Sequence, residues 1–261
     1  MPLRCINPEG QNIHSFDLSA DAWQALLQEN KKAKHLKMTC CNAAVVLKRS
    51  KLGTQFFAHK AKGMCATAPE REEHLILKQE AVLAARRNGW QANTEVSGRT
   101  PDGEEWRADV LAEKGKHKVA VEIQWSGQSN EETVTRQERY QKSGIRCLWL
   151  MRQTKFPISR DLPAVCLDGN LEKGFMALIP KRREMKTSKR NLPELWHKKI
   201  GIKHFLDAVF GRRFCHTLDL KGDIEISVRS RNVKCLKCRA ANLQICPIQF
   251  SAFNENGLVE N

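Results

Sequence analysis

Apolar residues recur at helical spacing in two stretches of the first third of the chain. In the segment 17–34, Trp23, Leu26 and Leu27 follow an Asp or Ser that can cap the first turn of a helix. The segment 69–90 begins at a proline, ends near a glycine and carries apolar residues among charged ones. We therefore expect one helix in each stretch.

Shorter apolar runs bounded by turn residues predict strands. The segment 38–65 is typical of two strands around a turn at 51–53. Three strands, a polar helix and an apolar strand are expected after the second helix. Their predicted ranges are 91–98, 104–113, 117–126, 130–144 and 145–151. Counted from the helix in 69–90, the order is αβββαβ, which implies an α/β layered core.

The rest of the chain alternates strand-like runs with basic segments. We expect strands at 164–170 and 174–180, a basic linker at 181–193 and a helix at 195–213. Shifts in composition divide the whole chain into three predicted regions. These are a small N-terminal Cys/His module at 1–68, the core at 69–152 and a basic C-terminal α+β region at 153–261.

The charge of the chain narrows the class of partner. The 261 residues carry a formal net charge of +15, which indicates a polyanion, with DNA as the leading candidate. The segment 181–239 holds 17 Lys or Arg against six Asp or Glu, although a solvated basic face would carry the same excess. The sequence has no run of about 18 apolar residues and no apolar signal segment, so we expect a cytoplasmic protein without membrane insertion.

Two acidic residues lie among apolar neighbours in adjacent predicted strands. Asp109 shares one face of its strand with Arg107. Glu122 shares one face of the next strand with Gln124 and Ser126. Because a buried carboxylate without a partner costs several kcal/mol, two facing acids are expected to hold something positive. A hard divalent cation that activates water for phosphodiester hydrolysis needs such oxygen ligands.

Five segments in order resemble those of a known family: FFAHK, EHLILK, RADVL, VAVEIQWS and RQERYQKSGIRCLWL. Over roughly residues 38–152 the chain resembles the competence protein CoiA family of the PD-(D/E)XK nuclease superfamily. The resemblance implies a restriction-endonuclease-like core in which Asp109 and Glu122 bind a catalytic Mg²⁺ or Mn²⁺. Gln124 stands where many relatives in the superfamily have lysine, and a neutral amide offers neither positive charge nor a proton acceptor of comparable strength.

Other polar residues are placed to support the two acids. Glu70, His74 and Lys78 recur every four residues and so line one helix face, although exposed helix positions would show the same spacing. Arg136 and Tyr140 are also four apart, where the resemblance implies a recurrent Arg-x-x-x-Tyr pair. The expected catalytic residues are Asp109, Glu122, Gln124, His74, Glu70, Glu95, Arg136 and Tyr140. The expected DNA contacts are Lys78, Arg107, Ser126 and Arg136.

The ten cysteines of the chain favour metal ligands over disulfides, given the expected compartment. One cluster either binds a structural zinc or consists of buried thiols, and its members are Cys40, Cys41, His59 and Cys65. A second candidate is half of a zinc knuckle, formed by Cys235 and Cys238.

These patterns together predict a Mg²⁺- or Mn²⁺-dependent DNA nuclease that hydrolyses phosphodiester bonds in competence, recombination or phage defence. Nothing in the sequence indicates a small-molecule cofactor. One alternative is a catalytically inactive DNA-binding or processing factor that keeps the nuclease fold, with Gln124 marking the lost activity. The other is a zinc-scaffolded protein-interaction module whose basic charge serves solubility.

Overall fold

The computed structural model divides into two compact units, Met1–Gly211 and Arg212–Asn261. The residues whose structure is described are 2–61, 70–125, 129–152, 162–180, 197–213, 224–228, 232–234, 241–244, 248–254 and 257–259. The predicted basic linker at 181–193 lies outside these ranges, as do Cys65, Ser126, Cys235 and Cys238. None of the helices within the described ranges has the length and apolar character needed to cross a membrane.

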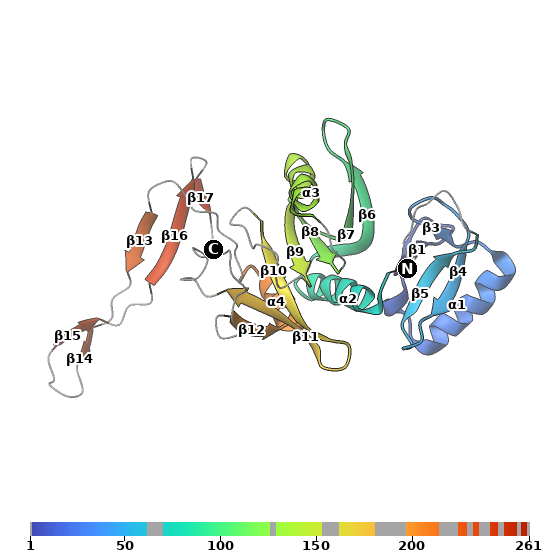
Figure 1. Ribbon diagram of the computed structural model, residues 1–261, viewed down its shortest axis with the longest axis horizontal. Helices are drawn as coiled ribbons and strands as arrows, with labels where there is room; N and C mark the ends of the chain where they lie inside the picture. The colour runs from blue at the N-terminus through green and yellow to red at the C-terminus, as the bar shows by residue number, and fades with distance from the viewer. Residues whose placement is uncertain are drawn as a thin grey trace. The chain divides into compact units, whose positions relative to one another are not determined.

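A seven-stranded sheet forms the centre of the first unit, in the order β12-β11-β10-β9-β8-β7-β6 (Figure 1). β9 pairs in parallel with β8 and with β10, whereas the other neighbours pair antiparallel. The strands are β6 (Gln91–Arg99), β7 (Glu105–Lys114), β8 (His117–Gln124), β9 (Arg146–Met151), β10 (Ala164–Asn170), β11 (Gly174–Pro180) and β12 (His197–Gly201).

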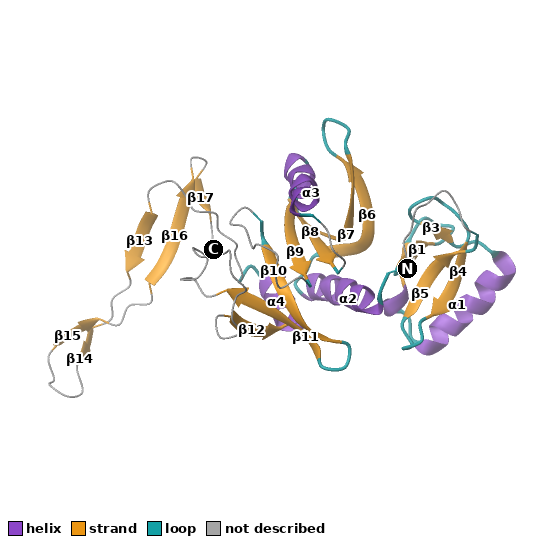
Figure 2. Ribbon diagram, in the orientation of Figure 1, coloured by secondary structure: helices purple, strands orange, loops and turns teal. Residues whose placement is uncertain are grey.

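Two helices complete the predicted αβββαβ order, and Figure 2 draws them in purple beside the strands. α2 (Glu72–Arg87) packs against β6, β7 and β8 through a buried face that includes Leu75 and Val82. Gly89, with a φ of +75°, follows its last turn, as expected for a residue that ends a helix in the left-handed region. α3 (Asn130–Lys142) starts at a capping box formed by Ser129 and Glu132 and carries the chain from β8 to β9.

The large sheet continues past residue 152, where the core was expected to end. β10 adds in parallel to β9, and β11 and β12 extend the sheet further. The prediction of one helix over 195–213 was wrong in its first part. Residues His197–Gly201 form β12 and pair with β11, and only Ile202–Phe210 are helical, as α4. A glycine at 201 and pairing with a neighbouring strand outweigh the local helical pattern.

The first sixty residues of this unit form two small sheets with one helix. β1 (Arg4–Ile6), β2 (Asn12–His14) and β3 (Lys37–Met38) make one sheet, and a 3₁₀ turn (Ser15–Asp17) follows β2. The predicted helix is α1 (Ala20–Ala33), and the Ser19 side chain accepts the N–H of Ala22 as its cap. The predicted hairpin is also present, as β4 (Val45–Arg49) and β5 (Gln55–His59).

Five strands are described in the second unit. β13 (Ile224–Val228), β16 (Ile248–Asn254) and β17 (Gly257–Val259) form an antiparallel sheet. β14 (Asn232–Lys234) and β15 (Ala241–Gln244) form a separate two-stranded ladder. The structure thus has a mixed α/β first unit and a second unit whose described part consists of strands.

Candidate active site

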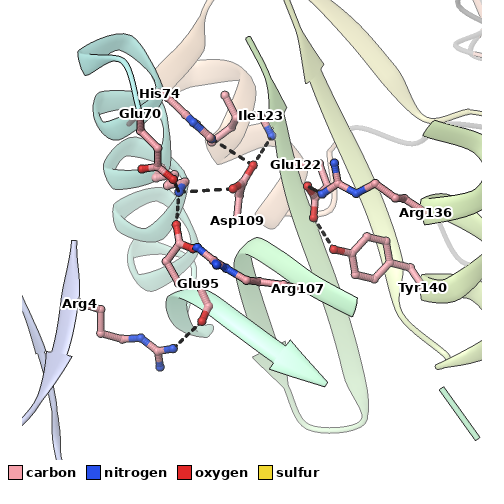
Figure 3. A network of polar contacts seen from close by, with 11 residues as sticks. Arg4, Glu70, His74, Glu95, Arg107, Asp109, Glu122, Ile123, Arg136 and Tyr140 are labelled. Atoms are coloured by element: carbon pink, nitrogen blue, oxygen red, sulfur yellow. Dashed lines mark hydrogen bonds and ion pairs between the residues drawn. The ribbon is translucent and has the colours of Figure 1, made fainter. Parts of the chain in front are cut away.

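The ladder between β7 and β8 stops at the two predicted acids. The last pair on that side is Val110 with Val121, so the next residues along the two strands are Asp109 and Glu122. Instead of a regular pair, the Asp109 carboxylate accepts the backbone N–H of Ile123, with 2.9 Å between Oδ2 and N. The two strands separate at this point, and the carboxylates lie at the resulting fork (Figure 3).

Asp109 is surrounded by positive charge. Its Oδ2 lies 3.1 Å from His74 Nε2, and its Oδ1 lies 3.3 Å from Lys78 Nζ. Burial by itself would raise the pKa of this carboxyl, but the Lys78 ammonium and His74 together hold the pKa of Asp109 well below its usual range. Asp109 is therefore kept ionised.

Lys78 is fully buried in α2 and is shared by three carboxylates. Its Nζ lies 2.8 Å from Glu70 Oε1 and also contacts Glu95 and Asp109. Burial would lower the pKa of this amine, but the surrounding carboxylates raise it well above the ordinary value. The predicted role of Lys78 was DNA binding, whereas this buried position favours a role in holding the carboxylates.

Glu95 adopts a backbone conformation that is rare for a strand residue. Its φ is +55°, and the β6–β7 register skips the pair that Glu95 would make with Asp109. The buried carboxylate accepts Lys78 and also Arg107, whose Nε lies 2.7 Å from Oε2. The carbonyl oxygen accepts Arg4 Nη2 at 2.9 Å, so the N-terminal sheet stabilises this strained residue.

Glu122 has different neighbours, although it stands on the adjacent strand. Its buried carboxylate accepts the Tyr140 hydroxyl and the Arg136 guanidinium from α3 (Figure 3). Burial, reinforced by the charge of Asp109, raises the pKa of Glu122 to about 8 in spite of Arg136. Burial and the Glu122 carboxylate also raise the pKa of Tyr140 well above its usual range, so its hydroxyl stays a donor.

Three side chains on the α2 side of the fork could hold a cation. Glu70, His74 and Asp109 each offer one ligand atom, and these atoms all lie within 4.8 Å of one another. Glu122 directs its carboxylate to the α3 side instead (Figure 3). Gln124, the last residue of β8, is partly buried. Glu70, Glu95 and Asp109 therefore contact Lys78, His74 contacts Asp109, and Arg136 and Tyr140 contact Glu122.

The predicted Cys/His cluster is formed in part by described residues. His59 Nε2 lies 3.2 Å from Cys41 Sγ and 3.5 Å from Cys40 Sγ, and the two sulfur atoms are 3.7 Å apart. A turn after β3 and the end of β5 bring the three residues together. Their ligand atoms lie within 4.8 Å of one another, which is close enough for a shared metal ion.

The residues of this site lie within the segment that matches a known protein family. Residues 70–162 match the model of the competence protein CoiA, nuclease-like domain. The segment 70–162 is therefore similar to a CoiA nuclease-like domain. It begins at Glu70 and includes all eight residues predicted to be catalytic. None of the curated proteins matches the chain.

One solved structure with a match is the crystal structure of a protein of unknown function, AF1548. It is 16% identical to this chain, with a TM-score of 0.24, and the match covers 29% of this chain and 46% of that chain.

Sequence reasoning missed one residue that supports the matched segment 70–162 from outside it. Arg4 belongs to a three-residue strand and contacts Glu95 across 91 positions of sequence. Nothing in the sequence around Arg4 indicates that contact. His74 and Lys78, in contrast, lie on α2 and contact Asp109, as their helical spacing predicted. The prediction was wrong for Glu70, which precedes the first helical residue, Glu72, and contacts Lys78 instead.

Proposed function

We propose that this chain is a Mg²⁺- or Mn²⁺-dependent DNA nuclease of the PD-(D/E)XK type. The observation that carries the proposal is the fork between β7 and β8, where Asp109 and Glu122 lie within a CoiA nuclease-like domain. Two carboxylates on separating strands are the donor set that a hard divalent cation requires. The network of cations around them keeps such a costly arrangement folded.

The donor atoms fit a divalent cation at Asp109. This carboxylate would hold the ion together with Glu122 across the fork, or with Glu70 and His74 on the α2 side. Oxygen ligands suit Mg²⁺ and Mn²⁺, and an imidazole is compatible with Mn²⁺. When bound, the cation would supply Lewis acidity at a phosphate oxygen and lower the pKa of a coordinated water.

The protein's own residues would divide the remaining work. Lys78 places a positive charge 3.3 Å from Asp109, and so supplies the charge that Gln124 lacks. Gln124 can orient a water by hydrogen bonding. Arg136 and Tyr140 hold Glu122 in place, and the guanidinium can also stabilise negative charge that develops on the phosphate.

Two observations, the net charge and the family match, support DNA as the proposed substrate. The net charge of +15 favours a polyanion, and phosphate contacts would make the affinity fall steeply with salt. A CoiA nuclease-like domain supports a role in competence, and the same hydrolysis would serve recombination or phage defence. An inactive DNA-binding factor is the second candidate, because Gln124 replaces the lysine of many relatives.

A cutting assay separates these candidates. Purified protein is incubated with plasmid, linear duplex and single-stranded DNA, with Mg²⁺, Mn²⁺ or EDTA. We expect metal-dependent cutting that Asp109→Asn and Glu122→Gln each reduce by about 10³-fold or more. Glu113→Gln is the matched control, since Glu113 is a half-buried acid on the same strand that pairs with Lys118 and lies outside the fork.

The outcomes of this assay are decisive in both directions. Wild-type rates in both fork variants would overturn the nuclease proposal. DNA binding without cutting in either metal would favour the inactive factor. Activity lost only in the two fork variants, and retained in Glu113→Gln, supports the enzyme.

We also propose a structural zinc at Cys40, Cys41 and His59. Their ligand atoms lie within 4.8 Å of one another, and two thiolates with an imidazole suit zinc. Metal analysis of the wild type, compared with His59→Ala, tests this proposal. We expect one zinc per chain in the wild type and its loss in the variant, and a zinc-free wild type would contradict it.

A further inference from the structure

A hollow of about 740 Å³ lies on the α3 side of the fork, and Glu70, His74 and Asp109 are not among the residues that line it. Its lining includes Arg136 and Tyr140, the two side chains that contact Glu122. β6 contributes Gly98, and Cys40 of the predicted zinc cluster also lines the hollow. The hollow therefore leads from the protein surface to the α3 side of the fork.

Positive charge dominates the lining of this hollow. Four arginines line it, against the single acid Glu105, and they are Arg99, Arg107, Arg136 and Arg139. The exposed fractions of their side chains run from 34% at Arg136 to 70% at Arg99, so solvent reaches all four. Because guanidinium groups present forked donors that fit phosphate oxygens, the lining is suited to a phosphodiester backbone.

An aromatic ring is fixed in the same lining. Trp106 lies against the β6 backbone at Gly98, where any side chain would collide with the ring. Its indole N–H donates to Ser143 Oγ at 2.9 Å, and its ring centroid lies 5.6 Å from that of Tyr140. Trp106 is only partly buried and thus offers a rigid aromatic surface among the arginines.

We infer that this hollow binds an extended single strand of DNA next to the phosphate that is cut. This inference rests on the proposed nuclease function and specifies its substrate. Phosphates would contact the arginines, and an unpaired base would stack on Trp106, which is how proteins bind single strands without reading sequence. The bases of a duplex are already stacked on one another, so a duplex offers no unpaired base to Trp106.

Binding measured without metal tests the inference separately from cutting. The full-length protein is titrated in EDTA with a short oligothymidine strand and with a duplex of the same length. We expect the single strand to bind more tightly and to quench tryptophan fluorescence. Trp106→Phe should bind the strand but lose most of the quenching, and Trp106→Ala should bind it roughly 5- to 150-fold more weakly.

Charge variants sharpen the test. Arg139→Gln should weaken binding and lower the slope of log affinity against log salt by about one. Arg146→Gln is the matched control, because Arg146 is exposed on β9 and does not line the hollow. Equal binding of strand and duplex, or full quenching in Trp106→Phe, would overturn the inference.

The two proposals fail in different ways. A protein that binds the single strand through Trp106 in EDTA, but cuts no DNA with metal, would refute the nuclease and keep the binding site. A protein that cuts DNA with metal, but whose strand binding does not depend on Trp106 or Arg139, would support the nuclease and refute the binding site.

Discussion

Asp109 and Glu122 occupy adjacent strands at one fork, yet their surroundings shift the pKa values of the two carboxyls in opposite directions. On the α2 side, Lys78 and His74 hold the pKa of Asp109 below its usual range. On the α3 side, burial and the charge of Asp109 raise the pKa of Glu122 to about 8, although Arg136 contacts it. Equal side-chain chemistry thus gives one permanently ionised carboxylate and one that can carry a proton near neutral pH.

These two environments explain how two acids on adjacent strands are stabilised together. Two ionised carboxylates at one fork would repel each other in a medium of low dielectric. Lys78 compensates the first charge, and proton uptake removes part of the second. A pair of acids whose environments push their pKa values apart is also the usual basis for dividing acid and base roles.

Lys78→Met should give the largest loss of stability. The substitution leaves Glu70, Glu95 and Asp109 without their shared ammonium, so we expect the free energy of unfolding to fall by about 3–5 kcal/mol. Urea unfolding of the wild type and the variant measures this loss of free energy. Lys118→Met, which breaks only an exposed pair with Glu113, should cost less than about 1 kcal/mol. Equal losses in both variants would contradict the role of Lys78.

The pH dependence of stability in the metal-free protein should separate the two carboxylates. The Glu122 carboxyl has an ordinary pKa of 4.5 and a folded value of about 8. The folded state therefore binds the extra proton between these values, and stability falls as pH rises through this window. Asp109 behaves in the opposite way, because its lowered pKa adds stability above 3.8 that is lost as pH falls below that value.

Urea unfolding of the wild type and Glu122→Gln between about pH 5 and about pH 8 tests this difference. The gap between the two proteins should change by up to about 1.4 kcal/mol per pH unit, since only the wild type titrates at this position. Parallel pH profiles would refute the raised pKa of Glu122.

Tyr140→Phe should weaken the α3 side alone. The buried Glu122 carboxylate loses the hydroxyl donor, which we expect to cost about 2 kcal/mol of stability and roughly 10- to 100-fold in cutting rate. Unfolding and the metal-dependent cutting assay give the two values. A variant that cuts as fast as the wild type would show that Tyr140 does not position Glu122.

Arg4→Gln should have the smallest effect, on the α2 side. The substitution removes the donor to the Glu95 carbonyl oxygen and weakens the support of a left-handed residue, so we expect about 1–2 kcal/mol of lost stability. The cutting rate should fall less than in Tyr140→Phe. An unchanged unfolding free energy would mean that Glu95 keeps its conformation without Arg4.

The sequence was sufficient for the longer elements of the fold. Alternation in 91–126 predicted β6, β7 and β8, and helical spacing predicted α2 with its face toward Asp109. It was insufficient for the short strands β1, β2 and β3, because two or three residues carry no period. The prediction of one helix over 195–213 failed because residues His197–Gly201 pair with β11 as a strand, and pairing with a distant strand leaves no local pattern in the sequence.

The candidate site shows the same limit. Asp109 and Glu122 could be found because acids among apolar strand residues are unusual. The burial of Lys78 could not be found, because a lysine on an amphipathic helix is usually solvated. Nor does any sequence rule place a glutamate in the left-handed region inside a strand, as occurs at Glu95.

The most direct test of a cation site shared by Asp109 and Glu122 is Mn²⁺ binding by the metal-free protein. Binding is measured as the loss of the electron paramagnetic resonance signal of free Mn²⁺. We expect the wild type and Glu113→Gln to bind the ion equally, and Asp109→Asn and Glu122→Gln each to bind it at least about 100-fold more weakly. Wild-type affinity in either fork variant would mean that Asp109 and Glu122 share no ion and would contradict this prediction.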